Sequence, residues 1–124
     1  MIGAFLAGLW AVIKIIAVIL IPLLSAVWLK NKISEKMAKN KVHKVAFVDT
    51  REVVDEYLND QINDLQGISM DDLEKMCEKT PYVTVNVDDE GETLTDFEGL
   101  KANEIESKVK TLLKNEEGMV IFEG

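Results

Sequence analysis

Few residues of this 124-residue chain have the types and spacing that chemistry requires. Asn86, Asp88, Glu90 and Gly91 follow the spacing of the first half of a calcium-binding loop. The twelfth position of such a loop holds a bidentate glutamate, and here it is Phe97. We therefore interpret this segment as the turn of a hairpin and expect no calcium site in it.

The other residues that could carry chemistry are isolated. The only histidine is His43 and the only cysteine is Cys77. One histidine cannot form a histidine-based metal site, and it has no nucleophile placed for a triad. One cysteine excludes an internal disulfide, and we interpret it as a core residue. The sequence therefore predicts that the chain is not an enzyme and has no catalytic, cofactor-binding or metal-binding residues.

The N-terminal part of the chain is strongly apolar. From Ile2 to Leu29 one charge, that of Lys14, occurs in 28 residues, and Lys30 and Lys32 then form a polar boundary. About 20 apolar residues suffice to cross the hydrocarbon core of a bilayer. A cleaved signal peptide is the alternative, but the basic N-terminal region of such a peptide is missing. We predict one transmembrane helix, with residues 1–30 as a membrane anchor.

Three residues of this apolar segment are candidates for contacts inside the membrane. Lys14 lies near its middle, where a charge is costly. Either Lys14 pairs with a polar group of another membrane helix, or the membrane-spanning part begins later and the ammonium reaches the interface. Ala4 and Gly8 are small residues four apart, a spacing that lets helices approach closely.

Charge divides the chain into two parts. Residues 1–41 have a net charge of +5 and residues 42–124 a net charge of −13. The lysines that follow the apolar segment predict a cytoplasmic location for the acidic part and a basic helical linker at residues 31–41. The acidic part disfavours nucleic acid and favours basic partners. The lysines stop transfer, contact anionic membrane lipid, or do both. The four lysines expected to contact lipid are Lys30, Lys32, Lys36 and Lys39.

Residues 42–124 predict an acidic α+β domain with the element order β-α-α-β-β-α-β. Val83, Val85 and Val87 alternate with polar residues, so we expect one face of the sheet to be in water. That pattern favours a mainly antiparallel sheet with helices on one face. The expected elements are a strand at 42–48, helices at 50–67 and 69–80, strands at 82–87 and 92–97, a helix at about 100–114 and a last strand at 119–122.

The order of segments also resembles a known family. After the apolar segment come KVAFVDTREVVDEYLNDQ, a helical segment, YVTVNVDDEGETLTDFEG and ANEIESKVKTLL. Over residues 42–113 this layout resembles the TrbI-type inner-membrane proteins of F-type conjugative transfer. The resemblance implies a membrane helix, a periplasmic domain and a non-enzymatic role in pilus dynamics and transfer. The lysine distribution predicts the opposite side of the membrane.

These observations lead to one main hypothesis and two alternatives. The main hypothesis is a non-enzymatic, single-pass subunit or adaptor of a larger complex in the cell membrane. Its expected partners are membrane lipid and other proteins of the complex, basic ones among them, and homo-oligomerisation is left open. The first alternative is an assembly component of a conjugation or secretion apparatus. The second is a small membrane-permeabilising effector, which the acidic domain makes the least favoured of the three.

Overall fold

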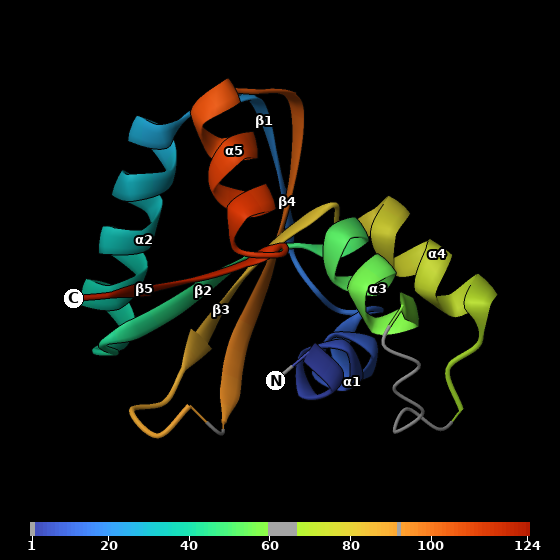
Figure 1. The fold of residues 1–124 in the computed structure, drawn as a ribbon. Helices are drawn as coiled ribbons and strands as arrows, with labels where there is room; N and C mark the ends of the chain where they lie inside the picture. Colours follow the sequence, from blue (N-terminus) through green and yellow to red (C-terminus); the bar gives the residue numbers. More distant parts are fainter. Residues whose placement is uncertain (1, 60–66, 92) are drawn as a thin grey trace.

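The computed structural model describes residues 2–59, 67–91 and 93–124. This part of the chain forms three layers, in which a five-stranded sheet has helices on both faces (Figure 1). In chain order the elements are α1 (Ile2–Val12), β1 (Val18–Leu24), α2 (Ala26–Asn40), β2 (Lys44–Asp49), α3 (Thr50–Asn59), α4 (Met70–Lys79), β3 (Tyr82–Val87), β4 (Leu94–Ile105), α5 (Ser107–Asn115) and β5 (Met119–Glu123).

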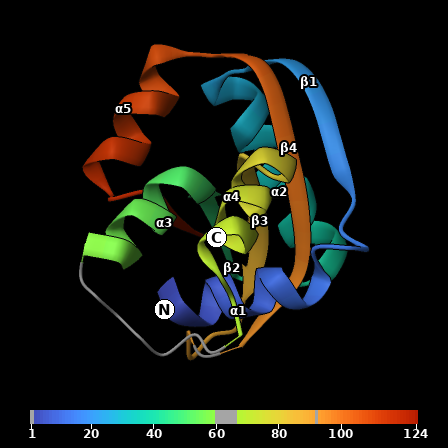
Figure 2. The ribbon, with the colours of Figure 1, turned by 90° about the vertical axis from the view of Figure 1, so that its right-hand side faces the viewer.

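The sheet is mixed, with the strand order β1-β4-β3-β2-β5. β1 pairs with β4 in parallel, and the other three pairings are antiparallel. β4 has 12 residues and carries β1 along one side and β3 along the other (Figure 2). β1 and β5 are therefore the edge strands. The parallel strand comes from the N-terminal segment, where no strand was predicted.

Both faces of the sheet are covered by an apolar core. Ala46 and Val48 of β2 pack with α1, α3 and α4, whereas Val45 and Phe47 of the same strand pack with α2 and α5. A strand that is buried on both faces has a continuous apolar sequence. The expectation of helices on one face only was therefore wrong.

The predicted wet face of β3 is also buried. Val83, Val85 and Val87 lie in the core beneath α1, α3 and α4, as their alternation predicted. Thr84 and Asn86 point to the other face, where they are buried as well. The helical layer of α2 and α5 covers that face, so polar side chains on a strand did not mean exposure to water here.

The apolar segment predicted as one helix, Ile2–Leu29, instead forms a helix, a strand and the start of a second helix. α1 ends at Val12, and the sequence VILIPLL then forms β1. Pro22 has no N–H to donate, and an edge strand tolerates that loss. Ser25 caps the start of α2, because its hydroxyl accepts a hydrogen bond from Trp28 N at 3.1 Å.

The predicted transmembrane helix was therefore wrong. Among the described residues, no helix combines the length and the apolar character needed to span a membrane. The longest described helix, α2, has 15 residues, or about 22 Å, whereas a bilayer core is about 30 Å thick. The predictions of a single-pass anchor and of a cell-membrane location depended on this helix and are overturned with it. The apolar residues serve in packing instead, and Phe5, Leu6 and Leu9 of α1 are fully buried.

Two helix starts show how local signals act in residues 44–123. Asp49 Oδ1 accepts a hydrogen bond from Glu52 N at the start of α3. Ser69 and Asp72 form a reciprocal capping box at the start of α4, as the sequence predicted.

The boundary between the fourth strand and the last helix was predicted wrongly. A helix was expected from about residue 100, but β4 continues to Ile105 and α5 begins at Ser107. Leu100 is fully buried in the sheet, where it pairs with a residue of β1 and a residue of β3. The pairing with β1 extends β4, and no local signal in residues 100–106 reveals that partner. Of the predicted helix 50–67, the apolar residues Ile62 and Leu65 lie outside the described residues.

Gly118, between α5 and β5, offers a test of the packing between the C-terminal strand and α3. Its φ is +92°, and a Cβ added there would lie 2.7 Å from Glu52 Cβ. Gly67 has a φ of +82°, with no described atom within 4 Å of an added Cβ, so it serves as the control for backbone strain alone. We expect Gly67→Ala to lower the free energy of unfolding by about 1 kcal/mol and Gly118→Ala by about 2–3 kcal/mol. Urea unfolding measures both, and equal losses would contradict the close packing at Gly118.

Candidate functional site

The three residues predicted to contact a membrane helix do not form one site. Lys14 lies exposed in the turn that follows α1, and Ala4 is exposed on the helix itself. Gly8 faces β4, where an added Cβ would lie 2.8 Å from Cζ of Phe97. The small residue therefore lets α1 approach a strand of the same chain.

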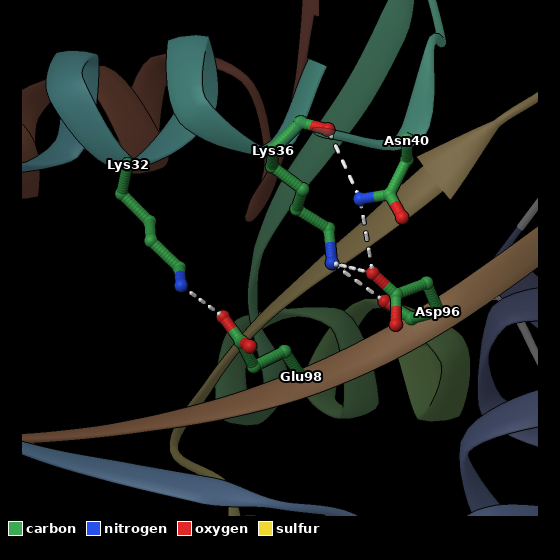
Figure 3. A network of polar contacts seen from close by, with 5 residues as sticks. All are labelled: Lys32, Lys36, Asn40, Asp96 and Glu98. Atoms are coloured by element: carbon green, nitrogen blue, oxygen red, sulfur yellow. Dashed lines mark hydrogen bonds and ion pairs between the residues drawn. The ribbon is translucent and has the colours of Figure 1, made fainter. Parts of the chain in front are cut away.

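The four lysines predicted to contact lipid divide into two pairs. Lys30 and Lys39 are exposed on α2. Lys32 and Lys36 point from α2 toward β4, where they meet Asp96 and Glu98 (Figure 3). Together with Asn40, the latter four residues form what we call the ionic cluster.

The ionic cluster is centred on Lys36, whose side chain is only 4% exposed. Its Nζ lies 2.7 Å from Asp96 Oδ2 and donates a second hydrogen bond to the Asp96 carbonyl, also at 2.7 Å. Asn40 Nδ2 donates to the Lys36 carbonyl at 3.0 Å and to Asp96 Oδ2 at 3.4 Å. Lys32 Nζ lies 2.6 Å from Glu98 Oε1 and forms an ion pair with it. The arrangement of these atoms does not make the pair a hydrogen bond as well.

The backbone at Asp96 explains how one residue gives Lys36 two acceptors. Asp96 has a φ of +54°, in the left-handed region that short polar residues tolerate better than most. In this conformation its carbonyl and its carboxylate both reach the same ammonium group. A buried charge is costly unless it is paired and hydrogen-bonded, so these contacts are what permit Lys36 beneath α2.

Further polar atoms lie on the same face of the sheet. Thr84 pairs with Glu98 across β3 and β4. Among the described residues, Thr84 Oγ1 and Asn86 Oδ1 have no hydrogen-bond partner. Two ammonium groups and two carboxylates balance each other in the ionic cluster, so it has no excess charge for a ligand. The arrangement is suited to positioning α2 on the sheet.

A second surface lies at the edge strand β1. The described residues include seven large hydrophobic side chains that are exposed, and four of them fall within residues 15–27. We call these four the edge surface: Ile15 (83% exposed), Leu20 (75%), Val27 (72%) and Leu23 (43%). These four residues are close in sequence, and two of them, Leu20 and Leu23, lie on an edge strand, which also presents unpaired backbone groups. This surface can bind another protein.

Burial is the main cause of the shifted pKa values of three groups: Cys77, Asp49 and Tyr82. Burial raises the pKa of the Cys77 thiol and disfavours the reactive thiolate. Burial also raises the pKa of Asp49, and burial together with the nearby Asp49 raises the pKa of Tyr82 to about 12. His43 precedes the first residue of β2 and Asp49 is the last, so the length of the strand separates them. Within the described ranges, no three His, Cys, Asp or Glu side chains are placed to hold a metal ion.

Sequence analysis missed both the ionic cluster and the edge surface for the same reason. The apolar residues of 15–27 were assigned to a membrane, and the lysines of 30–41 to its surface. The spacing of Leu29, Ile33 and Met37, at i, i+4 and i+8, indicates an amphipathic helix that packs on a core. Lys36 lies on the same side of that helix, which was the available signal for its burial.

Comparisons of the chain with protein-family models, with curated protein sequences and with solved structures found no match. The resemblance to the TrbI-type proteins stays a prediction. The function is therefore argued below from the geometry of the surfaces alone.

The Lys36–Asp96 pair predicts an asymmetric response to substitution. Asp96→Asn tolerates the same backbone conformation but leaves the Lys36 charge buried without its counter-ion, so we expect a loss of about 3 kcal/mol in the free energy of unfolding. Lys36→Met leaves a carboxylate that is 52% exposed and can be hydrated, so we expect a loss below about 1 kcal/mol.

The double variant Lys36→Met with Asp96→Asn is the matched control. Because it removes the uncompensated ammonium, it should recover most of the stability lost in Asp96→Asn. Urea unfolding of the four proteins completes the cycle. Equal losses in the two single variants would refute the view that burial of the ammonium dominates.

Proposed function

We propose that this chain is a non-enzymatic adaptor that binds another protein through the edge surface. One observation carries the proposal: the exposed apolar side chains of residues 15–27 lie on and beside an unpaired edge of the sheet. Such a surface is unfavourable in water, and a partner that covers it gains apolar contact area.

Addition of a strand is the mode of binding that suits this edge. β1 uses one side to pair with β4, and its other side is open to a segment from a partner. Leu20 and Leu23 of β1 supply the apolar contacts, and Val27 adds an exposed apolar side chain in the first turn of α2. Pro22 removes one backbone donor, which disfavours uncontrolled pairing along the whole strand.

The charges that border the edge surface define the expected partner more closely. Lys14 is next to Ile15 in sequence, Lys30 follows Val27 by one helical turn, and Lys101 pairs with Leu20 in the register of β1 and β4. On the acidic side, Leu23 pairs with Glu104 in the same register. The excess of lysine favours a segment with apolar residues at its centre and acidic residues at its ends. The predicted preference for basic partners was based on the net charge of residues 42–124, and it concerns the acidic surface of those residues and not the edge surface.

Photo-crosslinking from two positions tests this proposal. A photoreactive phenylalanine analogue is placed at Leu20, in the edge surface, or at Thr111, which is exposed on α5. In cells of the natural host we expect one discrete adduct with a second protein from position 20 and none of that mass from position 111. Adding Val27→Asp should abolish the adduct, because it buries a charge in the interface.

The other outcomes overturn the proposal. No adduct at position 20, or the same adducts from both positions, would mean that the edge surface is not a specific interface. An adduct of twice the chain mass of 13.9 kDa would identify a second copy as the partner and replace the adaptor with a homo-oligomer.

A further inference from the structure

A pocket between α1 and α4 is lined in part by Lys14, the residue that precedes Ile15 of the edge surface. Its volume is 480 Å³, which is within the range of small-molecule sites. The last turn of α1 and the residues after it form one wall, and the last turn of α4 forms the other. Both helices lie on the same face of the sheet (Figure 1). We refer to it as the basic pocket; its lining residues are Trp10, Ile13, Lys14, Lys75, Glu78 and Lys79.

A contact across the basic pocket holds its two walls together. Lys79 Nζ, at the end of α4, donates a hydrogen bond to the carbonyl of Ile13, just after α1. This carbonyl is near the C-terminal end of α1, where a cation is favourable. The contact therefore joins the end of α4 to the turn that follows α1.

The charge of the basic pocket is opposite to that of the chain as a whole. The chain carries −8, but the pocket has three lysines and one glutamate. Lys14 and Lys75 are exposed, and neither is within 4.0 Å of a described carboxylate. Their ammonium groups are thus available to a ligand. The three lysines repel a cationic ligand. Glu78 repels a ligand with several negative charges.

The apolar wall completes the chemistry of the basic pocket. Ile13 is buried, Trp10 is half-buried, and the methylene stems of the lysines add to the apolar surface. A ligand that satisfies both features has an apolar body and one negative charge at its end. We propose that the basic pocket binds a monoanionic amphiphile, an aliphatic carboxylate of medium chain length.

The tryptophan in the wall makes this proposal directly measurable. The chain has two tryptophans, Trp10 and Trp28, so the Trp28→Phe background leaves only the one in the pocket as a fluorophore. The full chain is titrated with decanoate below its critical micelle concentration, and far-UV circular dichroism checks that the fold is unchanged. We expect a saturable change in Trp10 emission whose affinity falls as salt is added.

Ligands and variants with matched chemistry separate charge from apolar contact. Decanol has the same chain without the charge, and decyltrimethylammonium has the opposite charge; we expect both to bind at least about tenfold more weakly than decanoate. Lys14→Gln and Lys75→Gln should each weaken decanoate about tenfold. Lys39→Gln, an exposed lysine outside the pocket, should leave the affinity unchanged.

Several results would overturn the proposal. They are the absence of saturation, equal affinity for decanol and decanoate, and equal loss in Lys39→Gln and Lys75→Gln. Amide NMR shifts on adding decanoate give a second readout, independent of fluorescence. Shifts at the ends of α1 and α4 are expected, whereas shifts confined to β1 would place the ligand at the edge surface and reject the basic pocket.

Discussion

The need to cover both faces of the central strands is the constraint on which the rest of the structure depends. β2 and β3 send buried side chains to each face, so a single helical layer would leave one set of them in water. Residues 2–40 supply what is missing: α1 joins α3 and α4 on one face, and α2 joins α5 on the other. β1, between the two helices, extends the sheet beside β4. The apolar N-terminal segment thus covers part of each face of the sheet and also adds a strand to its edge.

Some of the fold follows from local sequence signals and some does not. The capping box of Ser69 and the alternation of Val83, Val85 and Val87 depend only on neighbouring residues, and they predicted α4 and one face of β3. The division of residues 2–29 depends on partners far along the chain. α1 needs the face of β4, and β1 needs the open side of that strand. Apolar character alone is compatible with a membrane or with such partners, and the choice between them is a tertiary effect.

The candidate sites were less predictable than the elements, because they depend on which lysines the fold buries. Lys32 and Lys36 were grouped with Lys30 and Lys39 by sequence, yet α2 turns the first pair toward the sheet and the second pair to the surface. Lys32 and Lys36 are one helical turn apart and therefore lie on the same side of α2, where both form ion pairs with β4. The lysine of the apolar segment, Lys14, was predicted to lie within a membrane, but its neighbours in the fold are Trp10 and the end of α4.

The two candidate binding surfaces belong to the segment that also completes the core, and this decides how function can be separated from folding. The edge surface lies in residues 15–27, and one wall of the basic pocket is made by residues 10–14. Removing the segment would expose the core beneath α1 and α2 at the same time as it removed both surfaces. The side chains of the edge surface and the lysines of the basic pocket are nevertheless exposed, whereas those that hold the fold, such as Leu9 and Leu29, are buried. Single substitutions at exposed positions therefore change binding with little change in stability, and they distinguish a functional surface from a structural one where truncation does not.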